Sequence, residues 1–334
     1  MPVRQLVNDP ADLVPEALRG FARAHPELVR YHDDPAFVVR AGVRDGAKVA
    51  LVSGGGSGHE PLHVGFVGVG MLDAAVPGAV FASPTAYQIK AAIEAADSGQ
   101  GVLLIVKNYT GDVLNFQIAA ELAADEGIET RTVLVDDDLA TDGQEEGGPG
   151  RRGTAAVVAV EKICGAAAER GASLADLAAL GERVTGSART LALALASCTQ
   201  PGQSRPSFDL ADDEIEFGVG IHGEHGVGRR PYGPVRDLVG ELTRPIAKAL
   251  ELGHGDPVIA IVNGLGSTHD LELSAVHGEL TAILDDLGVA VIRSLVGSYV
   301  TSLDMRGCSI TLVRADDELV DLWDAPVRTP ALSW

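Results

Sequence analysis

Two histidines bordered by glycine carry the clearest chemical signal in this sequence. His59 closes the run SGGGSGH that begins at Ser53, and His222 lies within GVGIHGEHG, residues 218–226. A neutral imidazole acts as a base or as a nucleophile. Glycine lets backbone N–H groups approach a small polar ligand closely, so we interpret SGGGSGH as a ligand site. A tight strand-to-helix turn, with His59 opening the helix, is the structural alternative.

A lysine and an aspartate border the segment KNYTGD, from Lys107 to Asp112. Lys107 ends an apolar run, and Asp112 begins the next predicted helix. The sequence leaves two interpretations of Asp112 open. Its carboxylate is a helix N-cap, which is common, or it is a general base for a hydroxyl group in a cleft.

The segment around His222 also matches two other kinds of site. His222, Glu224 and His225 suggest a metal, but this spacing in a glycine loop fits tight metal ligands poorly and no cysteine is near. GVGIHG has the GxGxxG form of a dinucleotide-binding turn, but glycines and prolines follow where a helix should begin. We therefore disfavour metal and NAD, and we interpret His225 as a polar loop residue.

Other polar residues give weaker signals. Asn263 in VNGLGST follows a predicted strand, and we expect it to support its loop. The remaining histidines have no partner pattern. We expect surface or packing positions for His25, His32, His63, His254, His269 and His277.

The elements that position these residues alternate along the first half of the chain. Nearly continuous apolar segments predict strands at 48–53, 78–82, 101–107 and 129–135, with helices at 84–96 and 112–126. This pattern predicts an α/β fold with a parallel, three-layer sheet that has helices on both faces. In such sheets ligands bind beyond the carboxyl ends of the strands, where the candidate residues lie.

The second half predicts a smaller α/β domain with a mixed sheet. Strands are expected at 190–197, 214–221, 257–262, 290–294 and 309–313, and helices at 234–252 and 271–287. We expect the acidic, glycine-rich residues 136–152 to form an exposed loop, followed by helices at 153–170 and 173–184. The predicted domains are 1–189 and 190–334.

Composition limits the class of protein. The chain has 334 residues, enough for two domains, and its 47 acidic against 26 basic residues give a formal net charge of −21. Nucleic acids and anionic membranes require basic patches, so we expect neither as a partner. The apolar runs are too short for a membrane helix, the N-terminus has no secretory core, and the three cysteines show no CxxC pair. We expect a cytoplasmic protein.

Together these segments resemble the dihydroxyacetone-binding K subunit of dihydroxyacetone kinases. The similarity is carried, in order, by SGGGSGHEPLHVGFVGVGML, VFASPTAYQIKAAI, VLLIVKNYTGDVLNF, FGVGIHGEHG, VNGLGSTHDLEL and RSLVGSYVTSLDM. It covers nearly the whole chain, and the combination of GGGSGHEP, KNYTGD and GIHGE is highly specific. One position departs from the family pattern, because His225 stands where the family usually has proline.

The resemblance implies a role for each matched residue. His222 would hold a short ketose covalently, its nitrogen adding to the substrate carbonyl to give a hemiaminal, which requires a neutral imidazole. Asp112 would accept the proton of the substrate hydroxyl as phosphate arrives, and His59 would hydrogen-bond and polarise the substrate. The substrate pocket would include Gly56, Ser57, Gly58 and Lys107.

The resemblance also implies a phosphotransferase that acts with partners. The chain has no Walker A or kinase-type glycine loop and stops at Trp334, so we expect it to bind no cofactor itself. ADP or ATP with Mg²⁺ would lie on a separate nucleotide-binding subunit. In many bacteria a phosphotransferase-system protein recharges that subunit, and the sequence leaves this relay and ATP open as donors. The family implies a homodimer.

Three other functions stay open. One is a kinase subunit for another short ketose or aldose, such as erythrulose or glyceraldehyde. Another is a non-catalytic triose sensor that acts on a transcription regulator. An NAD-dependent dehydrogenase is the least favoured. A substrate panel, turnover with an added nucleotide-binding subunit, and NAD binding would separate these functions.

Overall fold

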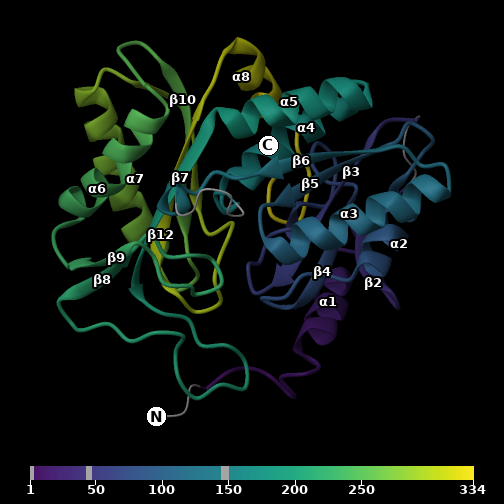
Figure 1. The fold of residues 1–334 in the computed structure, drawn as a ribbon, viewed down its shortest axis with the longest axis horizontal. Helices are drawn as coiled ribbons and strands as arrows, with labels where there is room; N and C mark the ends of the chain where they lie inside the picture. The colour runs from purple at the N-terminus through teal and green to yellow at the C-terminus, as the bar shows by residue number, and fades with distance from the viewer. Residues whose placement is uncertain (1–3, 43–46, 144–149) are drawn as a thin grey trace. The chain divides into compact units, whose positions relative to one another are not determined.

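The computed structural model describes residues 4–42, 47–143 and 150–334, which form two compact units (Figure 1). Unit 1 comprises Met1–Gln5, Asp136–Ala156 and Thr185–Val320, and unit 2 comprises Leu6–Val135, Val157–Val184 and Asp321–Trp334. A single cut at 189/190 does not reproduce this grouping, because 136–156 and 321–334 each belong with the other half of the chain. As a division into independently folding domains, that cut stays a prediction.

Unit 2 is built on a six-stranded sheet in the order β1-β2-β4-β3-β5-β6. The inner strands pair in parallel, which confirms the predicted α/β fold, and the hairpin β1–β2 adds two antiparallel strands at one edge. The hairpin escaped the sequence prediction because β1 has a single buried residue. The strands are β1 (Val29–Asp33), β2 (Ala36–Arg40), β3 (Ala50–Ser57), β4 (Ala74–Val80), β5 (Val102–Lys107) and β6 (Thr130–Val135).

Helices cover both faces of this sheet. On one face, α2 (Ala86–Ala96) and α3 (Thr110–Asp125) share an apolar core with β3 and β5. On the opposite face, α5 (Leu174–Gly186) lies so close to β6 that a Cβ on Gly181 would meet Cγ2 of Val133 at 2.5 Å. The three-layer prediction is therefore confirmed. The remaining helices of this region are α1 (Leu13–Ala24), α4 (Ala156–Glu169), α8 (Asp317–Asp324) and the 3₁₀ turn η1 (Val64–Phe66).

Local sequence explains where two of these helices begin. Thr85 and Gln88 form a capping box at the start of α2, each side chain bonding to the other residue's backbone. Ser173 caps α5, where its Oγ accepts from Asp176 N at 3.2 Å and donates to Asp176 Oδ2 at 2.7 Å. Such caps stabilise a helix by about 1 kcal/mol each. The apolar face predicted for α2 is buried, as Ile89, Ala92, Ile93 and Ala96.

The final segment of the described chain completes unit 2. Lys162 in α4 is fully buried, and its Nζ donates a hydrogen bond to the carbonyl oxygen of Leu322 at 2.8 Å. The same Nζ lies 5.5 Å from the centre of the Trp334 ring. Burial lowers the pKa of Lys162 to about 8. The segment 321–334 therefore supplies the groups that make this buried ammonium tolerable.

Unit 1 contains a mixed sheet of six strands in the order β11-β10-β12-β7-β8-β9. β10 and β11 are parallel and the other neighbours antiparallel, which confirms the predicted mixed sheet. The helices α6 (Val235–Ala249) and α7 (Asp270–Asp286) contribute to its apolar core. The strands are β7 (Ala188–Ala196), β8 (Glu214–Phe217), β9 (Gly228–Pro231), β10 (Pro257–Gly264), β11 (Ala290–Gly297) and β12 (Arg306–Arg314).

Two polar predictions in unit 1 have different outcomes. Asn263 supports a loop as expected, but the loop after β11 and not its own, because its Oδ1 accepts from the backbone N–H groups of Tyr299 and Val300, both at 2.8 Å. The exposed-loop prediction for 136–152 is wrong for its first residues. Asp137 is buried and accepts from Thr154 N at 2.6 Å and Ala156 N at 3.0 Å. Residues 144–149 lie outside the described chain.

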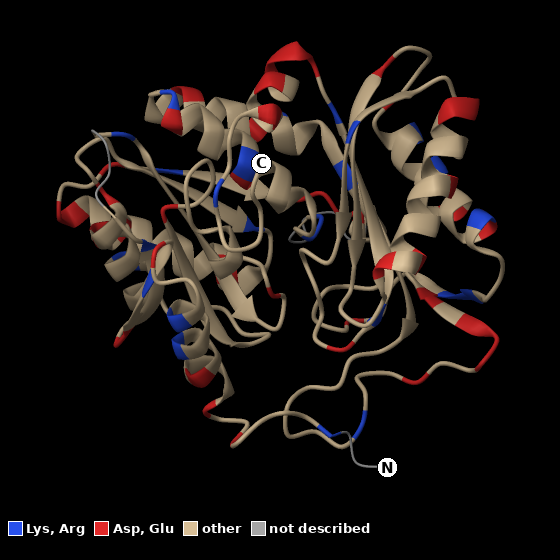
Figure 2. Cartoon of the chain, turned by 180° about the vertical axis from the view of Figure 1, so that it is seen from behind, with Lys and Arg blue, Asp and Glu red and all other residues tan. Residues whose placement is uncertain are grey.

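Acidic and basic residues occur on helices and loops of both units (Figure 2). The longest described helix, α7, has 17 residues and carries several acidic side chains. In the described ranges, no helix is long and apolar enough to cross a membrane.

Candidate active site

The glycine run of unit 2 is part of strand β3, not a turn after it. Gly54 pairs with Val76 and Gly55 with Pro77 of β4. A Cβ on Gly54 would meet the carbonyl oxygen of Val76 at 2.5 Å, so only glycine allows the two strands to approach this closely. The expected helix beginning at His59 is absent from the described chain, since irregular structure and η1 follow instead.

The three residues after Gly55 mainly shape the backbone. A Cβ on Gly56 would meet Ala82 N at 2.6 Å. Ser57 Oγ donates to the carbonyl oxygen of Gly78 at 2.7 Å, which occupies its hydroxyl proton. Gly58 has a φ of +104° and donates its N–H to the carboxylate of Glu60 at 3.0 Å. These contacts hold the strand end in one conformation.

His59 lies at this strand end and is buried. Its ring stacks on Phe81, with centroids 5.2 Å apart and an angle of 19° between the planes. Phe81 has a φ of +57°, which is uncommon for a bulky residue. The stack fixes the plane of the imidazole, as a hydrogen-bonding residue of a site requires.

Lys107 and Asp112 meet at the carboxyl end of β5. Lys107 Nζ lies 3.8 Å from Asp112 Oδ2, and both side chains are buried. The N-cap of α3 is Tyr109, so the N-cap interpretation of Asp112 is wrong and its carboxylate is free of that task. A Cβ on Gly55 would meet Lys107 Nζ at 2.5 Å, so this glycine leaves the space that the ammonium occupies.

His63 belongs to the same buried region, and the expectation of a surface or packing role is wrong. Its Nδ1 lies 2.6 Å from Glu161 Oε1 and its Nε2 lies 2.9 Å from Lys107 Nζ. Sequence reasoning missed both residues, because Glu161 is 98 positions away from His63. The one available signal was a lone carboxylate inside the apolar helix AVVAVEKIC.

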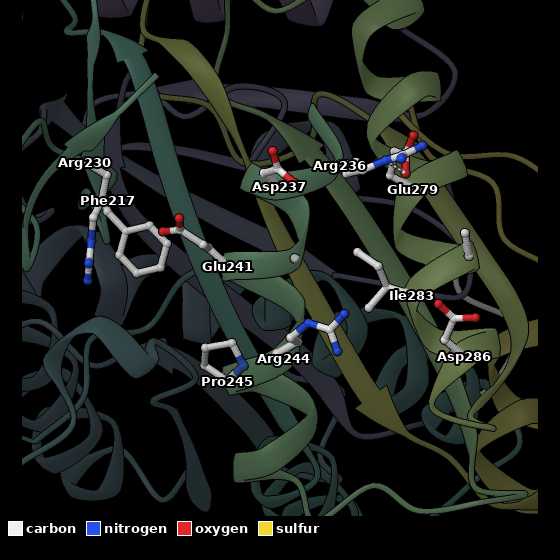
Figure 3. A pocket seen from close by; sticks show the side chains of 12 residues that line it. Phe217, Arg230, Arg236, Asp237, Glu241, Arg244, Pro245, Glu279, Ile283 and Asp286 are labelled. Carbon is white, nitrogen blue, oxygen red and sulfur yellow. Dashed lines mark ion pairs between the residues drawn. The ribbon is translucent and has the colours of Figure 1, made fainter. Parts of the chain in front are cut away.

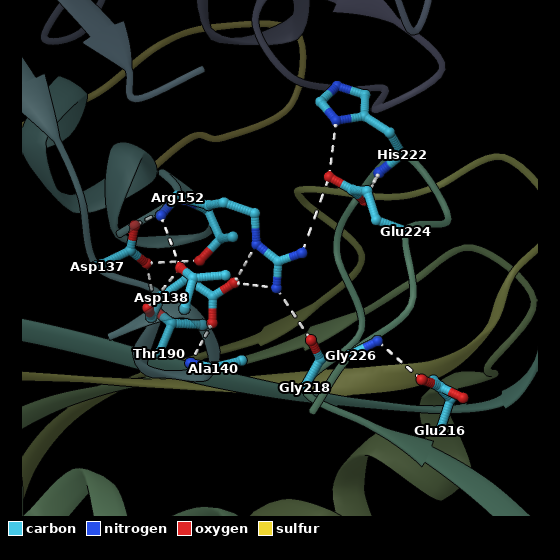
Figure 4. Close-up of polar contacts among 12 residues, drawn as sticks. Asp137, Asp138, Ala140, Arg152, Thr190, Glu216, Gly218, His222, Glu224 and Gly226 are labelled. Carbon is cyan, nitrogen blue, oxygen red and sulfur yellow. Dashed lines mark hydrogen bonds and ion pairs between the residues drawn. The ribbon is translucent and has the colours of Figure 1, made fainter. Parts of the chain in front are cut away.

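In unit 1, His222 lies in the loop between β8 and β9 and is held by Glu224 (Figure 4). Glu224 Oε2 accepts from the backbone N–H of His222 at 2.8 Å, and its Oε1 lies 3.3 Å from His222 Nδ1. A Cβ on Gly220 would meet Glu224 Oε2 at 2.0 Å, so glycine is required for this carboxylate to fold back onto the loop.

Arg152 supports the carboxylate from the other side. Its Nη1 lies 3.9 Å from Glu224 Oε1, and its Nη2 lies 2.7 Å from Asp138 Oδ2 and donates to Gly218 O at 2.9 Å (Figure 4). Burial acts to raise the pKa of Glu224, but the hydrogen bond with His222 and the charges of His222 and Arg152 lower it to about 2. Burial raises the pKa of Asp138 to about 6 despite Arg152. Sequence reasoning missed Arg152.

A carboxylate can only accept a hydrogen bond, so in the neutral form of His222 the contact with Glu224 places the ring proton on Nδ1. Nε2 then carries the lone pair, which is the form that a nucleophilic imidazole needs. His225 differs, because its side chain is 67% exposed and lies 3.5 Å from Glu216 Oε1. The loop interpretation of His225 is confirmed.

Strand β9 follows this loop where a dinucleotide-binding fold would have a helix. GVGIHG is therefore not a dinucleotide-binding turn. Across the described residues, no three His, Cys, Asp or Glu side chains gather closely enough to hold a metal ion.

A separate cavity of about 850 Å³ lies on unit 1 beside α6 and α7 (Figure 3). Both arginines and carboxylates line it, and Arg236 lies 3.8 Å from Glu279. Arg230 lies over the ring of Phe217 at 5.3 Å. The candidate residues do not line this cavity, so we do not assign substrate to it.

Comparison with known proteins gives matches along nearly the whole chain. The family model described as "Dak1 domain" matches residues 19–331. The dihydroxyacetone-binding subunit DhaK of a PEP-dependent dihydroxyacetone kinase from Escherichia coli K12 is 46% identical, with 99% of each chain covered. The corresponding subunit of PTS-dependent kinase 1 from Listeria innocua is 47% identical, covering 98% of this chain and 100% of its own. An L-erythrulose 1-kinase from Mycolicibacterium smegmatis is 41% identical, covering 98% of this chain and 57% of its own.

Solved structures also match this chain over nearly its whole length. The dihydroxyacetone kinase operon co-activator Dha-DhaQ has a TM-score of 0.89 at 34% identity, with 95% of this chain and 96% of its own covered. The dihydroxyacetone kinase of C. freundii in complex with AMP-PNP and Mg²⁺ has a TM-score of 0.88 at 35% identity. That match covers 99% of this chain and 61% of the C. freundii chain.

Proposed function

Because the chain belongs to the Dak1 domain family, we propose that it is the dihydroxyacetone-binding subunit of a dihydroxyacetone kinase. The observation that carries this proposal is the 46% and 47% identity to two subunits of that name, each matched over at least 99% of its own length. The activity is a phosphotransferase reaction in which a hydroxyl of dihydroxyacetone is the acceptor.

His222 is the proposed covalent anchor for the ketose. Its Nε2 lone pair forms a bond to the carbonyl carbon, and the carbonyl oxygen takes up a proton to become a hydroxyl. The imidazole gives up its Nδ1 proton, so the hemiaminal has the composition of the two reactants combined. The contact of 3.3 Å between Nδ1 and Glu224 supports this role, because the carboxylate stabilises the positive charge that develops on the ring.

Covalent binding suits a ligand this small. A triose offers few contacts, and its hydroxyl groups bind water as well as they bind protein. A reversible bond to the carbonyl accepts ketones or aldehydes and rejects glycerol, which has no carbonyl to attack. Selection then depends on one chemical group and not on contact area.

Asp112 is the proposed base, and it accepts the proton of the substrate hydroxyl as phosphate is transferred. Its burial and its position beside Lys107 support a reactive carboxylate in place of a surface one. His59 hydrogen-bonds the substrate, and Lys107 lines the pocket. Gly56, Ser57 and Gly58 complete the proposed pocket, as the family resemblance implies.

A separate subunit is proposed to carry the nucleotide. The relatives named as dihydroxyacetone-binding subunits support this proposal, which assigns ADP or ATP with Mg²⁺ to that partner and derives no step through them. The names of the relatives, PEP-dependent and PTS-dependent, favour a phosphotransferase-system relay as the donor. We also propose a homodimer, as the family resemblance implies.

Intact-protein mass spectrometry after incubation with dihydroxyacetone tests the anchor. We expect an adduct of one triose on the unaltered chain, none on His222→Ala, and an unchanged adduct on the matched control His225→Ala. Glycerol should give no adduct. An adduct that survives His222→Ala would remove this residue from the proposal.

A second function has its own support, since one structural relative is named an operon co-activator. A triose sensor would form the same adduct on His222 but would show no turnover with a nucleotide-binding subunit. The erythrulose kinase relative likewise supports a different ketose as substrate. A panel of dihydroxyacetone, erythrulose and glyceraldehyde, assayed with the partner subunit, separates the three.

A further inference from the structure

Behind Lys107, unit 2 contains a chain of buried polar side chains that the proposed mechanism does not use. Ser53 Oγ and Glu161 Oε1 both contact Nδ1 of His63, at 3.1 and 2.6 Å. Nε2 of His63 lies 2.9 Å from Nζ of Lys107. Nζ in turn lies 3.8 Å from Oδ2 of Asp112, so the chain ends at the proposed base.

The hydrogen bonds determine the tautomer of His63. Ser53 Oγ donates its single proton to the carbonyl oxygen of Ile105 at 2.7 Å, so toward His63 it can only accept. The proton between these two side chains therefore belongs to Nδ1 of His63. Glu161 Oε1 accepts from the same N–H. Nε2 consequently presents a lone pair to Lys107.

The tautomer sets the direction of the Lys107 ammonium. An ammonium has three N–H donors. One donates to Nε2 of His63 and one to the carbonyl oxygen of Gly54, at 3.3 Å. The remaining donor is left for the side on which Asp112 lies. The opposite tautomer of His63 would turn an N–H toward the ammonium and push it away.

We propose that Glu161 is a positioning residue that, together with Ser53, fixes the tautomer of His63 and thereby holds the ammonium of Lys107 beside Asp112. This inference rests on the proposed function, because it gives the Lys107–Asp112 pair its purpose. Glu161 touches neither substrate nor Asp112, and it acts through two other side chains.

The cost of burying Glu161 supports a role beyond packing. The side chain is fully buried, and its Oε2 has no hydrogen-bond partner among the described residues. A leucine would fill such a site without leaving a polar atom unsatisfied. The contact with His63 is what this carboxyl provides and a leucine cannot.

The electrostatics of the chain agree with this assignment. Lys107 faces His63, with His59 nearby, and the carboxyls of Asp112 and Glu161. Burial lowers the pKa of Lys107, and both carboxyls raise it. Burial, with the charge of Lys107, lowers the pKa of His63, so its ring stays neutral and keeps a lone pair. Burial raises the pKa of Glu161 to about 8, and a neutral carboxyl still accepts at Oε1.

The first test measures the tautomer directly. Nitrogen-15 NMR of the full, unaltered chain near neutral pH should show His63 protonated at Nδ1 and unprotonated at Nε2. Protonation at Nε2 would overturn the proposal, because Lys107 could not donate there. This readout needs no enzyme activity, so it stands even if the proposed function fails.

The second test compares two substitutions at one position. Glu161→Leu removes the nearer acceptor of Nδ1, at 2.6 Å, and leaves Ser53 Oγ at 3.1 Å, whereas Glu161→Gln keeps an oxygen at the nearer position. With the nucleotide-binding subunit present, we expect the leucine variant to lose up to about 100-fold in kcat, because Lys107 and Asp112 are misplaced. KM should change little, because the anchor on His222 is untouched. The glutamine variant should recover most of kcat.

The dependence of kcat on pH gives a further readout, which would not change if Glu161 had only a structural role. In Glu161→Leu, His63 is held at Nδ1 by Ser53 alone and is freer to turn an N–H toward Lys107, which lowers the pKa of its ammonium further, so the alkaline limb of kcat shifts to lower pH. Glu169→Gln is the matched control, since Glu169 lies on the same helix and pairs with Arg40 at 2.7 Å. It should leave the profile unchanged.

Equal kcat values and equal pH profiles in the leucine and glutamine variants would overturn the proposal. If the leucine variant does not fold, the NMR measurement on the unaltered chain decides. If the unaltered chain shows no kinase activity with its partner, the proposed function fails, and the tautomer result still tests the His63 contacts separately.

Discussion

His222 with Glu224 and His63 with Glu161 are the same chemical pair in two different settings. In each, a carboxyl oxygen faces Nδ1 and leaves Nε2 as the available lone pair. The first pair is two residues apart in a partly exposed loop, and the second is 98 residues apart in the interior of unit 2. The pKa of Glu224 falls to about 2, whereas that of Glu161 rises to about 8.

The difference shows what decides the state of a carboxyl. Glu224 accepts from the backbone N–H of His222 and faces Arg152, and these interactions exceed the effect of burial. Glu161 is deeper and has one unsatisfied oxygen, so burial exceeds the effect of Lys107 and Ser53. In the proposed mechanism the first pair presents its lone pair to the ketose, whereas the second presents it to Lys107 inside the protein.

The largest effect is expected at Asp112, the proposed base beside which the buried pair would hold Lys107. Asp112→Asn should lower turnover by about 10²–10⁴-fold, the usual contribution of a general base, because asparagine cannot take the hydroxyl proton. Adduct formation on His222 should persist. The measurements are kinase turnover with the partner subunit and intact mass. Full activity in this variant would remove Asp112 from the mechanism.

A smaller effect is expected from weakening the exposed pair. Glu224→Gln removes the charge that faces Nδ1 of His222, and loss of such a charge-assisted bond should weaken ketose binding by about 10-fold. Titration of the adduct by mass spectrometry measures this change. Glu214→Gln is a suitable control, because Glu214 lies in the neighbouring strand and pairs with Arg229. Unchanged binding in Glu224→Gln would mean that His222 needs no carboxylate.

The two carboxyls should also affect stability over opposite ranges of pH. The depressed pKa of Glu224 gives stability that is present above about 4.5 and is lost as pH falls toward 2. The raised pKa of Glu161 gives stability that is present below about 4.5 and is lost as pH rises toward 8. Denaturant unfolding at several pH values measures this dependence. The free energy of unfolding should vary less with pH in the acid range for Glu224→Gln, and less in the neutral range for Glu161→Gln. The same slope in both variants would contradict the contrast.

The smallest effect is expected at the position where the chain departs from its family. His225 is 67% exposed, and His225→Pro places there the residue that the resemblance assigns to the family. Surface substitutions of this kind usually change stability by no more than about 0.5 kcal/mol. We expect adduct formation and unfolding midpoints close to those of the unaltered chain. A large change in either would show that His225 helps to shape the His222 loop.

Much of the fold could be predicted because its inner strands are apolar on both faces. β5 is buried throughout, as its apolar run VLLIVK between glycine and the next helix predicts. β1 and β9 escaped prediction because their exposed polar residues hide the strand pattern. α1 escaped as well, since Leu18 is its single buried residue.

The residues of the candidate site likewise differ in whether a local sequence pattern reveals them. Residues that follow strands were predictable as a group, because sheet topology gathers the carboxyl ends of neighbouring strands; Lys107 and Asp112 are the example. Glu161 was not predictable, because no local pattern links a helix residue to a histidine 98 positions earlier. The roles assigned to His222, His59 and Asp112 remain predictions until they are tested.

The buried ammonium of Lys162 has a consequence for the timing of protein synthesis. Its acceptor, Leu322, is 160 residues further along, and at about 5–20 residues per second a ribosome needs on the order of 10–30 s to make that stretch. Through this interval the emerging helix α4 has no partner for its lysine and no Trp334 ring beside it. The interior of unit 2 around Lys162 is therefore completed only after residues 322–334 have been made.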